Sequence, residues 1–361
     1  MRFSLIWATA CLALGAESHY AKRGANSEAS DLAVTLSVPS SGKATVVEAT
    51  ITNNGKHDLG LLKIGTFLDD RPVKKLTVVD ETGAEIPFMG IELSVYYDGL
   101  KSEHFKTLKA GSSLTQAIDI ASAFDLEPGT YKVFAEGSIP SSSGGSSVTR
   151  SASYKSEAIS VTVDKPSLSA VKQSSMKRAV VANDTCTPEK LEVTSNAIRN
   201  CVTLARAAAA DAADVNSARF VEYFKSNETS ARKHVSGRLN AVVKECSNTE
   251  GGAISVSCTD PFGYCNDGGP LIAYTIWVNG YMVMCPLYYD TLPPLPQTCH
   301  KQDHATTTIH EMTHARAVWE GEVSTGDYAY GYENSTALDP SDALYNADNY
   351  SLYANAIYLD C

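Results

Sequence analysis

The cysteines constrain the fold of this chain more than any other sequence feature. All but Cys11 lie after residue 178, at Cys186, Cys201, Cys246, Cys258, Cys265, Cys285, Cys299 and Cys361. An even set of cysteines in a secreted chain is typical of a disulfide framework, although spacing alone leaves the connectivity open. We therefore expect residues 179–361 to fold as a unit that is held together by disulfide bridges.

The start of the chain has the pattern of a secretory signal. Met1 and Arg2 precede an apolar run over residues 3–14, and Leu14-Gly15-Ala16 provides the small residues that cleavage needs. The run ends at Glu17, short of the roughly 20 apolar residues of a membrane anchor. We therefore predict a secreted, extracellular protein with a signal peptide over residues 1–16 and no membrane partner.

The character of the chain changes at the dibasic pair Lys177-Arg178. Residues 179–361 hold 11 Lys or Arg and 22 Asp or Glu, whereas the residues before them hold 19 of each, and the net charge is -11. This charge disfavours nucleic acid as a partner. The Asn-x-Ser/Thr sequons also lie only after the pair, which predicts a glycoprotein; they are Asn183, Asn227, Asn334 and Asn349. We predict a propeptide over residues 17–178, removed after Lys177-Arg178, and a mature domain over residues 179–361.

The propeptide region has the alternating pattern of β-strands. Apolar residues recur with period two over residues 33–38, 45–51, 131–135 and 158–163, and turn signals such as Asn53-Asn54-Gly55 separate such runs. Short strands at this spacing suggest a β-sandwich of immunoglobulin-like type. We expect the serine-rich residues 141–147 to form a flexible loop.

The mature region predicts helices with a small hairpin. Helical patterns cover residues 188–213, 218–225, 230–246, 304–319 and 341–358, and Thr187 and Pro188 provide an N-cap and a first position. Apolar runs over residues 272–278 and 281–284 flank Asn279-Gly280, a strong signal for a tight hairpin turn. The predicted fold class is α+β, with a mainly helical domain of zincin type after the β-rich propeptide.

The strongest chemical signal is the segment His310-Glu311-Met312-Thr313-His314. Two histidines four positions apart on a helix project from one face, so that both imidazoles can bind one zinc ion. Glu311 lies between them and can take a proton from the attacking water and pass it to the leaving amine. This H-E-x-x-H arrangement is typical of zinc peptidases.

A catalytic zinc site of this kind needs a third protein ligand. No histidine follows His314, so the ligand must be a downstream carboxylate, and the candidates are Glu320, Glu322, Asp327, Glu333, Asp339, Asp342, Asp348 and Asp360. Spacing favours Glu333 or Asp327, and glycines flank Asp327 that let the chain turn back toward the metal. The residues alone do not choose between these two.

Residues 179–361 resemble deuterolysin, the fungal secreted member of the aspzincins. That family pairs H-E-x-x-H with a downstream G-T-x-x-D-x-x-Y-G element whose aspartate is the third zinc ligand. The resemblance implies His310, His314 and Asp327 as ligands of one Zn²⁺, Glu311 as general base, and Tyr330 as part of the catalytic element. Val323-Ser324 stand where the family has Gly-Thr.

The resemblance also covers the C-terminal run that begins at Asn346 and the terminal cysteine. It implies that Asp348 supports the site and that a tyrosine before the zinc helix, Tyr288 or Tyr289, assists catalysis. It further implies disulfides Cys186–Cys258, Cys265–Cys285 and Cys299–Cys361, which leaves Cys201 and Cys246 for a fourth.

These features predict a secreted zinc endopeptidase, made as a monomeric zymogen, that prefers basic proteins. After Glu245 the chain has only two basic residues, Lys301 and Arg316, against 14 acidic ones, so the mature domain should attract cationic chains. Two alternatives are a lysine-specific aspzincin endopeptidase and a secreted binding or surface protein with a structural zinc site.

Overall fold

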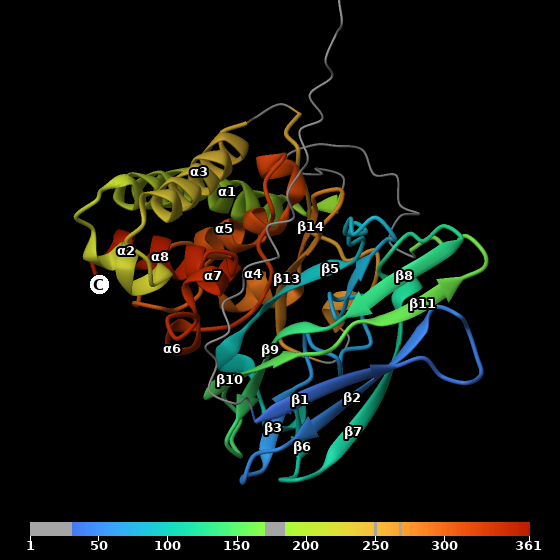
Figure 1. Cartoon of the computed structure of the whole chain (residues 1–361). Helices are drawn as coiled ribbons and strands as arrows, with labels where there is room; N and C mark the ends of the chain where they lie inside the picture. Colours follow the sequence, from blue (N-terminus) through green and yellow to red (C-terminus); the bar gives the residue numbers. More distant parts are fainter. Residues whose placement is uncertain (1–30, 170–184, 249–250, 267–268) are drawn as a thin grey trace, which may run out of the picture.

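The computed structural model describes residues 31–169, 185–248, 251–266 and 269–361. We refer to residues 31–169 as the N-terminal half and to the described residues from 185 onward as the C-terminal half. Strands dominate the first and helices the second, and the two halves meet along strand β5 (Figure 1). The predicted signal peptide, Cys11, the pair Lys177-Arg178 and Asn183 lie outside the described residues.

The N-terminal half is β-rich, as its alternating pattern predicts. Its strands are β1 (Leu32–Ser37), β2 (Val46–Asn53), β3 (Leu59–Leu62), β4 (Thr77–Val79), β5 (Ile91–Val95), β6 (Phe105–Leu108), β7 (Ser113–Asp119), β8 (Gly129–Phe134), β9 (Glu136–Ser142), β10 (Arg150–Lys155) and β11 (Ile159–Val163). In β2 the alternation is clear, because Val47, Ala49 and Ile51 are fully buried while their neighbours are half-buried.

These strands form three small sheets rather than the two sheets of an immunoglobulin-like sandwich. The sheet orders are β1-β2-β7, β10-β9-β3-β6 and β11-β8-β4. One apolar core, which includes Val47, Leu61, Phe124 and Val133, joins them. The strands are short, and β5 leaves to pair with the other half, so no sheet of this half exceeds four strands.

The serine-rich segment is only partly the loop that its composition predicts. Ser141 and Ser142 end strand β9 and are buried, and Ser141 pairs with Arg150 of β10. A flexible loop over all of residues 141–147 was therefore wrong at its start. Strand pairing with β10 outweighs the low strand propensity of serine there.

The C-terminal half contains the predicted helices together with two short helices, over Pro286–Thr291 and Tyr332–Ser335, that the patterns did not predict. They are α1 (Pro188–Ala213), α2 (Ala218–Phe224), α3 (Thr229–Cys246), α4 (Pro286–Thr291), α5 (His304–His314), α6 (Tyr332–Ser335), α7 (Pro340–Ala343) and α8 (Ala347–Leu359). Helix α1 begins where its cap predicts, because the Thr187 hydroxyl accepts from the Lys190 amide at 3.4 Å.

Two helices are shorter than their patterns predict. Helix α5 ends at His314, and a 3-10 turn over Arg316–Trp319 follows it. The pattern over residues 341–358 divides into α7 and α8, separated by Asn346, which has extended backbone angles. Both breaks let a loop approach the histidines of α5.

A four-stranded sheet lies beside these helices, in the order β12-β14-β13-β5. Strands β12 (Ser255–Ser257), β13 (Leu271–Ile276) and β14 (Tyr281–Met284) belong to the C-terminal half. The predicted hairpin between β13 and β14 is confirmed, and Gly280 has the positive φ of 66° that such a turn requires. The fourth strand, β5, comes from the N-terminal half and was not expected from the sequence.

All four disulfides are confirmed: Cys186–Cys258, Cys201–Cys246, Cys265–Cys285 and Cys299–Cys361. The second joins α1 to α3, and the fourth ties the residue after α8 to the segment before α5. Removing a native disulfide from a small secreted domain typically costs about 2–5 kcal/mol. The bridges therefore brace the helices that surround α5.

The structure also bears on the predicted glycosylation sites and on the predicted lack of a membrane anchor. Asn349 is fully buried in α8, where its side chain donates to the backbone oxygens of Tyr223 and Ser335, so its sequon is unsuited to carry a glycan in the folded protein. Asn227 is exposed and remains open to modification. Within the described ranges, no helix has the length and apolar content of a membrane span.

Candidate metal centre

Helix α5 carries the H-E-x-x-H segment and is buried along its whole length. Asp303 caps it, because one carboxylate oxygen accepts from the amides of Ala305 and Thr306 at 2.9 and 3.0 Å. The helix packs against α1, α8 and strand β13. Neighbours on several sides therefore fix the direction in which His310 and His314 project.

His310, His314 and Asp327 converge on one point. The two Nε2 atoms lie 3.1 Å apart, and Asp327 Oδ1 lies 3.3 Å from that of His310 and 3.4 Å from that of His314. Among the described residues, these three form the group whose ligand atoms are close enough to hold one metal ion. Two imidazole nitrogens and one carboxylate oxygen are a donor set that suits zinc and leaves a fourth position open.

The loop that presents Asp327 is held on both sides. Thr325 accepts from His314 Nδ1 through its carbonyl at 3.0 Å and donates its amide to Thr313 at 3.2 Å. Asn346, at the start of α8, accepts from the amides of Tyr328 and Ala329 at 2.8 and 3.1 Å. Sequence reasoning missed the roles of Thr325 and Asn346, because their partners lie 11 to 18 positions away, beyond the reach of a local pattern.

Of the candidate third ligands, only Asp327 joins the histidines. Glu333, its rival by spacing, is exposed on α6. Gly331 just before α6 has a φ of 75°, which favours glycine, and this turn directs the chain from Asp327 back toward α8. The choice between the two carboxylates therefore depends on how the loop folds.

Asp348 contacts the metal centre from behind, through His310. Its Oδ1 lies 2.9 Å from His310 Nδ1, and its Oδ2 accepts from the Gly331 amide at 2.7 Å. A carboxylate on the far nitrogen of a metal-binding histidine fixes the tautomer and orientation of the ring. The contact of Asp348 with His310 is compatible with the supporting role that the resemblance implies, which stays a prediction.

Glu311 lies next to the two histidines and is fully buried. Its Oε2 accepts from the Thr275 hydroxyl on β13 at 2.5 Å. Burial raises the pKa of Glu311, while the positive charge that the histidines can carry opposes this shift. A carboxyl group whose pKa is raised toward neutrality is suited to take up and release a proton.

Two buried carboxylate oxygens test whether a metal fits this site. Glu311 Oε1 has no hydrogen-bond partner, and Asp327 Oδ1 makes no well-directed hydrogen bond although both histidine Nε2 atoms are near. A buried oxygen without a partner is costly. A divalent cation bound to Asp327, with water beside Glu311, satisfies both atoms, so the residues fit a metal centre.

The three tyrosines named from the sequence differ in the hydrogen bonds that their hydroxyls make. Tyr288 is fully buried on α4, and its hydroxyl donates to the His304 carbonyl at 3.3 Å; Tyr289 pairs with Thr194 at 3.0 Å. These hydroxyls are bonded outside the ligand cluster. Tyr330 instead lies three residues after Asp327, and its hydroxyl donates to the Leu93 carbonyl of β5 at 3.4 Å.

Tyr330 has the protonation state that a hydrogen-bond donor needs. Burial raises the pKa of Tyr330 well above its ordinary value, and the charges of Asp327 and Glu92 raise it further. The hydroxyl therefore keeps its proton at neutral pH and remains a donor, here to the Leu93 carbonyl.

A helix-borne H-E-x-x-H segment, a third carboxylate ligand and a buried glutamate beside them together define a metallopeptidase site. The model of the deuterolysin metalloprotease (M35) family matches residues 1–361. The chain belongs to this family, and it is a metalloendopeptidase.

Similar proteins agree with this assignment. A neutral protease 2 homolog of Botryotinia fuckeliana is 41% identical over 363 residues, which cover 99% of each chain. A neutral protease 2 homolog of Sclerotinia sclerotiorum is 39% identical over 334 residues, or 91% of each chain, and one of Aspergillus terreus is 37% identical over 367 residues and all of each chain.

We expect Asp348→Asn to lower metal affinity by about 10–100-fold, because an amide orients His310 less well than a carboxylate does. The change is measured by titrating the folded variant with zinc in competition with a chelator of known zinc affinity. Asp339→Asn is the matched control, since Asp339 is exposed and its side chain caps nothing. Equal zinc affinities in the two variants would contradict the positioning role of Asp348.

Proposed function

We propose that this chain is a secreted, zinc-dependent endopeptidase that prefers basic proteins and is made as a zymogen. The convergence of His310, His314 and Asp327, with Glu311 beside them, carries this proposal. A bound zinc ion would supply Lewis-acid chemistry, polarising the scissile carbonyl and lowering the pKa of the attacking water. The two histidines and Asp327 would hold one ion per chain.

The chain's own residues would divide the remaining work. Glu311, held by Thr275, would take a proton from the attacking water and deliver it to the leaving amine. Tyr330 would donate its O–H to the oxygen that becomes negative in the transition state. Asp348 would keep His310 in the correct tautomer, and Thr325 would do the same for His314.

The preference for basic proteins rests on charge. After Glu245 the chain has only two basic residues, Lys301 and Arg316, against 14 acidic ones. An acidic surface raises the local concentration of cationic substrates, and salt weakens this effect. The lysine-specific alternative predicts instead a strict requirement for one lysine at the cleaved bond.

The zymogen proposal rests on the dibasic pair Lys177-Arg178 between the two halves. Cleavage there would release residues 179–361, which contain the whole metal centre and all four disulfides. The cysteines, sequons and signal pattern agree with passage through a secretory pathway.

The experiment that tests the function uses the chain after cleavage with a dibasic-specific protease. We expect one zinc per chain, loss of activity on chelation and recovery with zinc. We also expect a lysine-rich protein to be cut roughly tenfold faster than its acetylated form at low salt, with the difference shrinking in high salt. Cleavage confined to bonds before lysine would favour the lysine-specific alternative, and an inert protein with zinc bound would refute the proposal.

A further inference from the structure

Strand β5 of the N-terminal half lies on the edge of the sheet that flanks the metal centre. It pairs antiparallel with β13, with Glu92 opposite Thr275 and Leu93 opposite Tyr274. Thr275 is the residue that holds Glu311. In Figure 1, β5 lies beside β13 at the junction of the two halves. An extended segment on this edge occupies the path that a peptide substrate would follow by β-augmentation.

The peptide groups of β5 are held on both sides. The Trp277 amide donates to the Gly90 carbonyl at 3.2 Å. Because peptide groups alternate along a strand, the amides of Thr275 and Ala273 also face β5. On its other side, Leu93 donates its amide to Asp327 Oδ2 at 3.3 Å and accepts from the Tyr330 hydroxyl at 3.4 Å.

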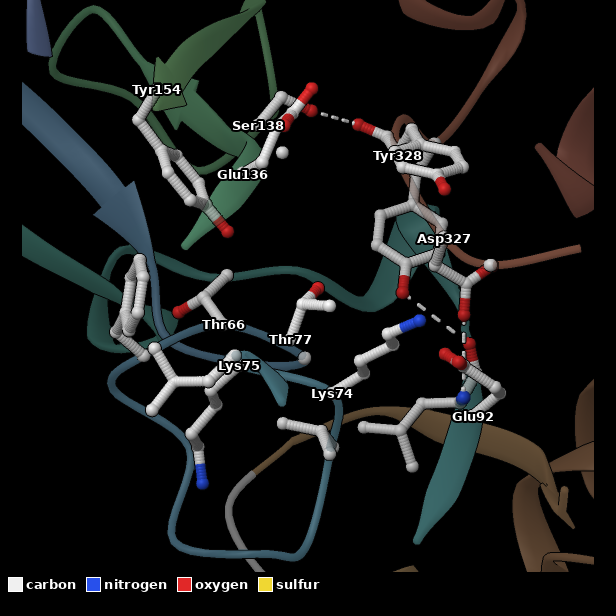
Figure 2. Close-up of a pocket in the computed structure, with 18 of the residues that line it drawn as sticks. Thr66, Lys74, Lys75, Thr77, Glu92, Glu136, Ser138, Tyr154, Asp327 and Tyr328 are labelled. Carbon is white, nitrogen blue, oxygen red and sulfur yellow. Dashed lines mark hydrogen bonds between the residues drawn. The ribbon is translucent and has the colours of Figure 1, made fainter. Parts of the chain in front are cut away.

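Leu93 contacts two residues of the site through two successive peptide bonds, Leu93–Ser94 by its carbonyl and Glu92–Leu93 by its amide. Its carbonyl oxygen accepts from the tyrosine that we propose as the oxyanion donor, and its amide contacts the proposed third ligand. Figure 2 shows Asp327 reaching down to β5 beside Glu92, with Lys74 pointing toward the same place. All five residues of β5 are buried. The strand is therefore enclosed between the two halves, beside Asp327.

A second segment of the N-terminal half contacts the residue behind the metal centre. The Tyr97 hydroxyl donates to Asp348, whose other oxygen faces His310. The neighbouring backbone is fixed by Gln302, which accepts from the Tyr97 amide at 3.2 Å and donates to the Val95 carbonyl at 2.8 Å. The N-terminal half thus touches the site at β5 and again just after it.

Apolar packing holds β5 in place. Ile91, Leu93 and Val95 belong to a buried cluster with Tyr274 and Ile276 of β13. The interface around this cluster is incompletely filled. One cavity, of about 80 Å³, lies between Lys74, Ser138 and Asp327 (Figure 2), and another, of about 290 Å³, lies between Phe88, Trp277 and Arg316. Such gaps reduce the van der Waals contacts between the two halves, so the N-terminal half can be separated from the C-terminal half more easily.

We infer that the N-terminal half is a built-in inhibitor that places β5 where the substrate strand binds and the Leu93 carbonyl where the scissile carbonyl lies. This inference rests on the proposed function, because it names the regulation of the same site. The released C-terminal half would then offer the edge of β13 to an extended substrate. Tyr97 would add to the inhibition by its contact with Asp348.

The test compares the intact chain with the chain cut after Lys177-Arg178 and freed of its N-terminal half. We expect the intact chain to be at least about 100-fold less active than the released form. Its affinity for a fluorescent hydroxamate peptide should be lower by about the same factor. Hydrogen exchange gives a readout without catalysis: the amides of Ala273, Thr275 and Trp277 should be protected in the intact chain and exchange at least roughly tenfold faster once released.

Variants in the N-terminal half keep the released enzyme unchanged. Leu93→Pro removes the amide that contacts Asp327, and we expect the intact variant to be at least about tenfold more active than the intact parent. Tyr97→Phe removes one hydrogen bond to a carboxylate and should raise probe binding by the intact chain by roughly tenfold. Tyr131→Phe is the matched control, because its hydroxyl bonds Glu127 within the N-terminal core, at 2.8 Å.

The outcomes separate the two proposals. An intact parent that binds the probe and cuts peptides as well as the released form would overturn the inhibitor, as would equal probe binding by Tyr97→Phe and Tyr131→Phe. If Leu93→Pro fails to fold, the tyrosine pair still decides. A released form that is inactive but whose β13 amides lose protection would refute the proposed function and support the placement of β5.

Discussion

The Glu311→Gln variant is expected to lose about 10²–10⁴-fold in kcat/KM while still binding one zinc ion. Glutamine has nearly the same shape and can still pair with the Thr275 hydroxyl that now lies 2.5 Å from Oε2. It cannot take up the proton that the attacking water must lose. The measurement is peptide hydrolysis by the released enzyme, with zinc determined on the same preparation.

Glu320→Gln provides the matched control for this variant. Glu320 is exposed just after the 3-10 turn that follows α5, so the same chemical change there should leave activity and zinc content unaltered. The N-terminal half is removed from both variants by the same added dibasic-specific protease, so that incomplete cleavage after Lys177-Arg178 is not mistaken for a loss of catalysis. If Glu311→Gln keeps parental kcat/KM, Glu311 is not the base.

Asp327→Asn is expected to have the second large effect, a loss of zinc affinity of at least about 100-fold. This loss should exceed that of Asp348→Asn, because Asp327 would bind the metal itself whereas Asp348 contacts only a ligand. The variant removes a negative charge whose oxygen lies 3.3 and 3.4 Å from the two histidine Nε2 atoms. Activity at limiting zinc should fall in parallel. A thermal melt with and without zinc gives an independent measure, because zinc at a hundredfold excess over its Kd stabilises the parent by about 2.7 kcal/mol.

The control for Asp327 is Glu333→Gln, the other carboxylate that spacing allowed as a ligand. Glu333 is exposed on α6, so its variant should bind zinc and melt as the parent does. The opposite result, in which Glu333→Gln loses zinc and Asp327→Asn keeps it, would mean that the loop rearranges around the ion and would reject the proposed ligand set.

The sequence predicted the features that depend on near neighbours. The spacing of His310 and His314, the cap of α1 and the hairpin at Asn279-Gly280 each follow from rules that act over one turn or two strands. The family resemblance implied three disulfides and left Cys201 and Cys246 for a fourth, and the structure contains all four. It also implied Asp348, whose contact with His310 the structure contains.

The arrangement of the N-terminal strands was less predictable. Alternation correctly indicated strands such as β2 and β11, yet it contains no information on which strands share a sheet. The run Ile91–Val95 is buried on both faces and pairs with a strand far along the chain, so neither alternation nor a nearby turn marks it.

The sequence by itself determined which reactive residues are present: two histidines and a glutamate on one helix, several downstream carboxylates, and eight cysteines for four bridges. The tertiary structure decided which carboxylate lies beside both histidines, which tyrosine contacts Leu93, and that β5 pairs with β13. The amide of Leu93 and the carboxylate of Asp327 are 234 positions apart in sequence. Local patterns reach over a few residues, whereas contacts at that separation are fixed only when the two halves pack together.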